Sequence, residues 1–271
     1  ANNRNAWPWA FIESIGHVLE LNSPQMSNQA PRLSIVIPAK NEALRLPPSI
    51  RQIRNIFPDE AWEFIIVIEL SADGTEAAVR EAIGGDRRFV VIANPVARGK
   101  GYGVKTGRLR ARGDLIFFMD ADLSVPLGYI PEFLKHAEEA DVLVGSRRHP
   151  ESIIRVHQSF TREFSGRMFN LALRLAGITR LADTQCGFKA FRRDAAQAVF
   201  SKLEQDGFGF DVEVLLLASQ LGFRSLELPV EWADVKGSKV SFLSGFEALR
   251  DAILAARRIK RKYPTHAKSR S

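Results

Sequence analysis

The sequence predicts an α/β fold in which helices cover both faces of a mostly parallel sheet. Five short runs rich in β-branched and aromatic residues have the length of strands: 33–37, 64–69, 89–93, 115–119 and 141–146. Segments with helical periodicity alternate with them, near 47–57, 75–83, 102–112 and 127–139. Strands that are apolar on both faces are typical of a sheet buried between two helical layers.

The composition agrees with one large folded body. The chain has 271 residues, of which 45% are apolar and 25% charged, and this excludes a disordered or fibrous protein. Cys186 is the only cysteine, which excludes a disulfide framework and a cysteine-rich zinc site and favours a reducing compartment. No apolar run approaches the roughly 20 residues that span a bilayer.

The two ends of the chain differ from this alternating body. Apolar residues recur at near-helical spacing from Trp7 to Leu21, and 22–31 has the composition of a linker. We expect a helix that packs on the body or, because Trp favours that zone, one that lies at a membrane interface. Residues 1–20 lack the features of a signal peptide, so secretion is not expected.

The alternation of strands and helices breaks beyond 154, where a long helical stretch covers about 157–177.

The net charge of +7 is concentrated near the C-terminus. Residues 236–271 contain ten Lys or Arg and two acids, so the rest of the chain is nearly neutral. This pattern fits a solvated helix, a helix on an anionic membrane or, third, a nucleic-acid contact. The body has no basic stripe interleaved with aromatic residues, so we expect no nucleic-acid partner. We predict a cytoplasmic protein, peripheral on the cytoplasmic face of the membrane.

We predict three parts: an N-terminal helical appendage and linker over 1–32, an α/β domain over 33–243, and a basic amphipathic helix and tail over 244–271. In parallel sheets, ligands bind beyond the carboxyl ends of the strands. Segments that contain polar or charged residues follow four of the predicted strands. They are Pro38 to Glu42, Glu69, Asp120 to Ser124, and Arg147 with Arg148. Chemistry is therefore expected at this edge.

Asp120 and Asp122 follow the fourth apolar run. In an extended segment, carboxylates two residues apart point the same way and could share one hard divalent cation. The alternative is one helix cap and one solvated acid. Gly99 and Lys100 belong to a glycine-rich segment before a helix, which suits either anion binding or a flexible turn. Arginines after the fifth strand suit phosphates, although arginines on a solvated loop are common.

Taken together, the motifs resemble those of family 2 glycosyltransferases. They occur in the same order: Ser34-Ile-Val-Ile-Pro-Ala-Lys-Asn-Glu, Asp73-Gly-Thr, Gly99-Lys-Gly, Asp120-Ala-Asp-Leu, Gly145-Ser-Arg, Cys186-Gly-Phe-Lys, Phe210-Asp-Val-Glu, Pro229-Val-Glu-Trp and Gly237-Ser-Lys-Val. Over about 33–245 the chain is most similar to dolichyl-phosphate glucose and mannose synthases. The resemblance implies the GT-A fold, a Rossmann-like sheet that uses a nucleotide sugar and Mg²⁺ or Mn²⁺.

The resemblance also implies roles for individual residues. The nucleotide sugar would contact Pro38, Ala39, Asn41, Glu42, Glu69, Gly99, Lys100, Asp120, Ala121 and Asp122. Asp120 and Asp122 would hold the metal. The acceptor phosphate would contact Arg147, Arg148, Arg162, Ser165 and Lys239. The residues expected to act in catalysis are Asp122, Arg147, Arg162, Asp211 and Glu213.

Two departures from the family pattern affect these expectations. Ile68-Glu69-Leu70-Ser71 stands where the family usually has Asp-Asp-Gly-Ser, which leaves UDP-glucose and GDP-mannose both open as donors. The membrane-spanning helices of many relatives are missing. We therefore expect inverting, metal-dependent hexose transfer to a polyprenyl phosphate, with transfer to a sugar or small soluble acceptor as the alternative. A catalytically inactive module that binds membrane or nucleic acid is the third hypothesis.

Overall fold

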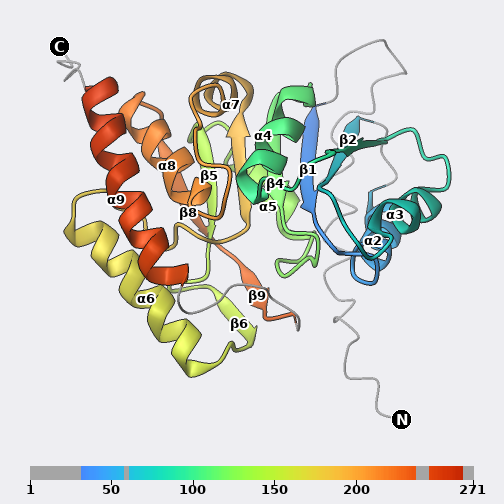
Figure 1. The fold of residues 1–271 in the computed structure, drawn as a ribbon, viewed down its shortest axis with the longest axis horizontal. Coiled ribbons are helices and arrows are strands. Elements are labelled where there is room, and N and C mark those ends of the chain that lie inside the picture. The colour runs from blue at the N-terminus through green and yellow to red at the C-terminus, as the bar shows by residue number, and fades with distance from the viewer. Residues whose placement is uncertain (1–31, 58–60, 236–243, 265–271) are drawn as a thin grey trace.

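A computed structural model describes residues 32–57, 61–235 and 244–264. Within these ranges the main sheet has seven strands in the order β3-β2-β1-β4-β7-β5-β8 (Figure 1). The strands are β1 (Leu33–Ala39), β2 (Trp62–Ile68), β3 (Phe89–Ala93), β4 (Leu115–Met119), β5 (Val142–Ser146), β7 (Phe188–Arg192) and β8 (Ser225–Pro229). The helices are α2 (Leu46–Ile56), α3 (Thr75–Ile83), α4 (Lys100–Arg110), α5 (Tyr129–Lys135), α6 (Phe160–Leu175), α7 (Arg193–Phe200), α8 (Phe210–Gln220) and α9 (Ser244–Lys262).

The predicted α/β class and its five strands are confirmed. Strands β1 to β4 pair in parallel, as do β5 and β8, whereas β7 lies antiparallel between β4 and β5. Neither β7 nor β8 was expected from the sequence. Strand β7 contains Lys189, whose side chain is fully buried, so its short run lacks the continuous apolar pattern of a central strand.

Two apolar cores lie on opposite faces of the sheet. Along β1, Ile35 belongs to the core that α2, α3 and α5 cover, and Val36 to the core covered by α4 and α6–α9. Successive side chains of a strand point to opposite faces, so a strand with helices on both sides is apolar throughout. Burying a side chain such as Phe117 contributes about 1.5–3 kcal/mol.

Helix α9 closes the second core. Its buried residues Ala252, Ala255, Ala256 and Ile259 recur at helical spacing, and the helix contacts α8 and α6. The helix predicted within 244–271 is therefore present as α9, and its buried face packs on the body. The predicted appendage over 1–32 lies outside the described residues except for Arg32, and the division into three parts stays a prediction. None of the helices in the described ranges combines the length and apolar composition needed to cross a bilayer.

A second, two-stranded sheet lies near the carboxyl ends of the main strands. It pairs β6 (Ile153–Val156) with β9 (Glu231–Ala233) in parallel. Strand β9 almost directly continues β8, and this brings Trp232 close to Arg147, just after β5 (ring centroid to guanidinium carbon 5.5 Å). The small sheet thus forms one wall of the functional edge.

Candidate active site

A cavity of about 1120 Å³ opens at the carboxyl ends of β1, β2, β4 and β5. It is the place where the sequence predicts the chemistry. The predicted site residues among those that line it are Pro38, Ala39, Asn41, Glu42, Glu69, Gly99, Lys100, Asp120, Ala121, Asp122, Arg147, Arg148, Arg162, Ser165 and Asp211. Lys239 lies outside the described residues. The structure therefore brings together side chains that are more than 170 positions apart in sequence.

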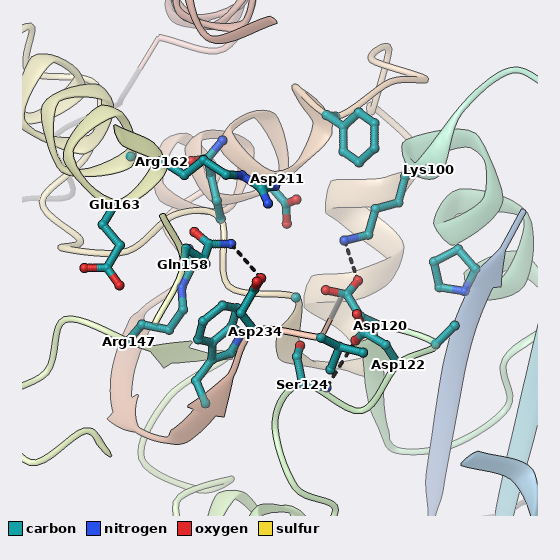
Figure 2. A pocket seen from close by; sticks show the side chains of 18 of the residues that line it. Lys100, Asp120, Asp122, Ser124, Arg147, Gln158, Arg162, Glu163, Asp211 and Asp234 are labelled. Carbon is teal, nitrogen blue, oxygen red and sulfur yellow. Dashed lines mark hydrogen bonds and ion pairs between the residues drawn. The ribbon is translucent and has the colours of Figure 1, made fainter. Parts of the chain in front are cut away.

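Asp120 and Asp122 lie together on the turn that follows β4 (Figure 2). The turn places Leu123 in the left-handed region (φ 51°), and Asp122 Oδ1 accepts a hydrogen bond from the Ser124 amide at 3.1 Å. Burial and the neighbouring charge of Asp120 raise the pKa of Asp122 above its ordinary value. Two mutually repelling carboxylates of this kind favour a cation between them.

Lys100 supplies a positive charge at this place. Its Nζ lies 2.6 Å from Asp120 Oδ1, at the first residue of α4 (Figure 2). Burial acts to lower the pKa of Lys100, but the carboxylates of Asp120 and Asp211 outweigh it and hold the pKa above its usual range. The ammonium group is therefore charged and points into the acidic part of the cavity.

Gly187 allows the carboxylate of Asp120 to lie against the backbone of the loop before β7. A Cβ atom at Gly187 would overlap that carboxylate. The glycine of the Cys186-Gly-Phe-Lys motif thus leaves the room that the Asp120 carboxylate occupies. The antiparallel strand β7, which starts at Phe188, is what brings this loop beside the end of β4.

Glu69 holds the glycine-rich segment in place. The side chain is nearly buried, and its Oε1 accepts a hydrogen bond from the Gly99 amide at 2.8 Å. Gly99 has a φ of +125°, and a Cβ there would collide with the Asp206 carbonyl, so only glycine fits. Glu69 lines the cavity, but one of its two carboxylate oxygens is already hydrogen-bonded to the Gly99 backbone.

The loop after β1 is bonded to the loop after β2. Asn41 has a φ of 53°. Its backbone N–H donates to Ser71 Oγ (3.0 Å), and its side-chain Oδ1 accepts from the backbone N–H of Ala72 (2.9 Å). The Glu42 amide donates to Thr75 Oγ1 at 2.8 Å. These contacts give the predicted nucleoside side of the cavity a fixed shape.

Arginines occupy the opposite end of the cavity. Arg147 forms a two-point ion pair with Asp183, which is fully buried, and lies over the ring of Trp232. Arg148 lines the cavity, and its buried Nε has no hydrogen-bond partner in the described ranges. Helix α6 adds Arg162 and Ser165 (Arg162 is labelled in Figure 2). The site is thus acidic near β4 and basic near α6.

Asp211 and Glu213 have different surroundings. Asp211 lines the cavity, and its Oδ1 lies 2.5 Å from Nζ of the buried Lys189. Glu213, which was also expected to act in catalysis, is not among the described residues that line the cavity. Its carboxylate accepts hydrogen bonds from the amides of Glu204 and Gln205 and pairs with Arg258 of α9. Residues two apart on a helix point to different sides, and α8 begins at Phe210, so the two acids cannot share one role.

Sequence reasoning missed several polar residues at this edge. Lys189 ends the Cys186-Gly-Phe-Lys motif and Asp183 lies three residues before it, but their partners Asp211 and Arg147 are more than 20 positions away. Asp234 lines the cavity and accepts a hydrogen bond from Gln158 at 3.3 Å (Figure 2). A lone acid after a short strand carries no spacing signal, so only the fold reveals it.

Comparison with known sequences is consistent with this geometry. The model of the family described as Glycosyl transferase family 2 matches residues 34–200. A dolichyl-phosphate beta-glucosyltransferase of Trichomonas vaginalis is 31% identical over 222 residues, which cover 77% of this chain and 68% of the relative. The enzyme of that name from Drosophila melanogaster is 32% identical (82% and 73% covered), and the one from Homo sapiens 30% (87% and 77%).

Solved structures agree on the fold. A crystal structure of glucosyl-3-phosphoglycerate synthase from Mycobacterium tuberculosis in complex with Mn²⁺, UDP and phosphoglyceric acid superposes with a TM-score of 0.65. The superposition covers 94% of this chain and 84% of the synthase chain, and the two sequences are 17% identical. The predicted GT-A fold and the prediction of a glycosyltransferase similar to dolichyl-phosphate beta-glucosyltransferases are confirmed. From its motifs, its sheet and its sequence relatives, this chain belongs to glycosyl transferase family 2.

Proposed function

We propose that this enzyme transfers a hexose, with inversion, from a nucleotide sugar to the phosphate of a polyprenyl phosphate. The observation that carries the proposal is the division of one cavity into an acidic end with Lys100 and a basic end with Arg147. A departing nucleoside diphosphate and an attacking phosphate need separate positive surroundings. Lys100, together with a cation held by Asp120 and Asp122, would supply the first, and the arginines at the other end supply the second. The names of the sequence relatives support the same acceptor class.

The acid pair has the chemistry of a magnesium or manganese site. Carboxylate oxygens suit hard divalent cations. The raised pKa of Asp122 reflects its burial and, in addition, the repulsion by Asp120 that a cation would relieve. The described residues contain no cluster of three or more candidate ligand side chains, so Asp120 and Asp122 would share the ion with diphosphate oxygens. Such an ion, when bound, supplies electrophilic stabilisation of the leaving diphosphate.

The side chains of the chain itself perform the remaining steps. Lys100 stabilises the negative charge that develops on the departing diphosphate, a type of contribution worth about 10²–10³ in kcat for one donor. Arg147, Arg148 and Arg162 hold the acceptor phosphate and offset its repulsion from the diphosphate. A phosphate monoester is largely dianionic at pH 7. It therefore attacks the anomeric carbon without a general base.

Asp211 favours a phosphate acceptor over a hydroxyl acceptor. A sugar hydroxyl would need a carboxylate to take its proton. Asp211 and Glu213 are the acids that could take that role, and Asp211 is the one that lines the cavity. Its Oδ1 is already in a 2.5 Å ion pair with Lys189, which also donates to the Cys186 carbonyl at 2.6 Å. The ion pair thus occupies the carboxylate oxygen that a general base would present to a hydroxyl.

The location of the reaction is part of the proposal. We place the enzyme in the cytoplasm, peripheral on the cytoplasmic face of a membrane, where a polyprenyl phosphate would be found. Support comes from α9, on which Arg250, Arg257 and Arg261 are exposed while Ala252, Ala255, Ala256 and Ile259 pack inward. Each basic side chain near an anionic surface is worth about 1 kcal/mol.

Transfer assays with defined acceptors test this function. Enzyme and Mn²⁺ are incubated with UDP-glucose or GDP-mannose and either a polyprenyl phosphate or a soluble sugar, and the products are identified. We expect the lipid-linked hexose, lost in Asp122→Asn and in excess chelator. Asp114→Asn is the matched control, because Asp114 is exposed at the opposite end of β4. A glycosylated soluble sugar would replace the proposal by the alternative acceptor class, and a lack of any donor turnover would indicate an inactive binding module.

A further inference from the structure

Helix α6 carries an apolar stripe that the described fold leaves uncovered. The stripe is made of five side chains at spacings of four, four, three and four residues: Phe160, Phe164, Met168, Leu171 and Leu175. Phe160 is 82% exposed and Leu175 80% exposed, so the exposed stripe extends from the first residue of the helix to the last. Residues at these spacings share one helix face. A soluble protein rarely exposes a continuous apolar face of this length without a partner.

The opposite face of α6 explains why the stripe stays outside. Phe169, Leu173 and Asn170 are buried, and the first two belong to the core that α9 also covers. The helix is therefore already anchored on one side. Its exposed face is apolar in addition to its packing face, which is not the pattern of an ordinary surface helix.

The charge beside the stripe identifies the partner. Arg167 and Arg174, both exposed, follow stripe residues at i+3 and lie along one border of it. Glu163 is the one acid on this helix against three arginines, and its carboxylate is hydrogen-bonded to the His157 ring at 2.7 Å. Helix α9 lies beside α6 (Figure 1) and exposes Leu254 among basic residues. A second copy of the chain would bring one positive surface against another, whereas an anionic bilayer accepts both the apolar and the basic side chains.

The same helix connects this surface to the cavity. Arg162 and Ser165 of α6 line the cavity, whereas the stripe lies on another part of the helix circumference. A helix lying in the headgroup layer would therefore hold the arginine end of the cavity at the membrane surface. The phosphate of a lipid could reach the arginines while its hydrocarbon chain stays in the bilayer.

We propose that α6 lies flat on an anionic bilayer and inserts Phe160, Phe164 and the rest of its apolar stripe below the headgroups. The vesicle contact itself does not depend on catalysis. Its use, the capture of a membrane-resident acceptor, rests on the proposed function. The proposal assigns the insertion to α6 and leaves α9 an electrostatic part.

Flotation of the full-length protein with vesicles tests the contact. Wild type is expected to float with vesicles that contain phosphatidylglycerol and to bind phosphatidylcholine vesicles more weakly. Phe160→Ser with Phe164→Ser should reduce partitioning by at least roughly tenfold, given the transfer free energy of two phenyl side chains. Leu109→Ser is the matched control, because Leu109 is 68% exposed on α4, and it should bind as wild type does.

Two further readouts distinguish the outcomes. The thermal midpoint of the double variant and its turnover of a short-chain, water-soluble prenyl phosphate should match wild type, whereas transfer to an acceptor embedded in vesicles should fall. Unchanged flotation of the double variant overturns the proposal, and so does a wild-type dimer that the double variant converts to monomers. If flotation depends on the stripe but no acceptor phosphate is glycosylated, the proposed function fails and the membrane surface stands.

Discussion

The guanidinium of Arg147 is held by the buried carboxylate of Asp183 through two contacts, Nε to Oδ2 at 2.6 Å and Nη2 to Oδ1 at 2.8 Å. Asp183 is itself fixed, because its amide donates to Glu227 Oε1 at 2.9 Å. Burial acts to raise the pKa of Asp183, but Arg147 outweighs it and holds the pKa far below its usual range. The predicted phosphate-binding arginine is thus fixed in position before any ligand arrives.

We predict that Asp183→Asn weakens the acceptor site and the fold together. Leaving a buried partner of an ion pair unpaired costs about 3–5 kcal/mol, and urea denaturation measures it. The KM for the acceptor phosphate should rise while the KM for the nucleotide sugar stays constant. A loss of stability with both KM values unchanged would mean that Asp183 has only a structural role.

The same pair predicts a pH dependence of stability. The folded-state pKa of Asp183 is depressed, so its stabilisation is present above the unfolded value of about 3.9 and is lost as the pH falls below that value. Wild type should lose free energy of unfolding in this range, and Asp183→Asn should lose less. Parallel pH profiles for the two proteins would contradict this assignment.

Gly187→Ala is predicted to weaken metal binding without preventing folding. The new Cβ would overlap the carboxylate of Asp120, which must then move. Changes beside a metal ligand typically cost 10–100-fold in affinity, and titration with Mn²⁺ and UDP measures this. Gly128→Ala serves as the control, because a Cβ there meets nothing within 4 Å and its φ is −59°. Equal Mn²⁺ affinity in both variants would count against a metal role for Asp120.

The sequence was sufficient for the parts of the fold and site that local patterns encode. Runs such as Leu115 to Met119 predict strands, and the strand order then places Asp120 and Lys100 at one edge. The antiparallel strand β7 was not predictable from pattern, because it contains the buried Lys189, whose partner Asp211 lies 22 positions away. Charges that are neutralised across the fold remove the alternation on which sequence reasoning depends.

Glu213 shows a different limit. The motif that contains it and Asp211 matches the family, and this led to a shared role for both acids. The helix that begins at Phe210 separates their directions, and Arg258, 45 positions later, pairs with Glu213. Contacts of a C-terminal helix with the body cannot be derived from the spacing of a short motif.

Lys100→Met should change catalysis and metal binding in opposite directions. The ammonium group lies 2.6 Å from Asp120 and competes with a cation for that carboxylate in the nucleotide-free enzyme. Without it, Mn²⁺ should bind the free enzyme more tightly. The charge on the departing diphosphate loses a partner, so kcat should fall by about 10²–10³. Single-turnover kinetics and Mn²⁺ titration measure the two effects, and weaker Mn²⁺ binding in the variant would contradict the competition.

Asp122→Asn is predicted to stabilise the metal-free fold while abolishing transfer. The folded-state pKa of Asp122 is raised by burial and by Asp120, so its ionised form costs free energy at neutral pH, and the cost disappears as the pH falls toward the unfolded value of about 3.9. An amide at this position keeps the Oδ1 contact with the Ser124 amide and carries no charge. Thermal melts in chelator should therefore show a higher midpoint for the variant at pH 7 and a smaller difference near pH 4. Added Mn²⁺ with UDP should raise the midpoint of wild type alone, because a ligand stabilises only the protein that binds it. A variant less stable than wild type at pH 7 in chelator would contradict this prediction, because it would show that the ionised Asp122 carboxylate stabilises the metal-free fold.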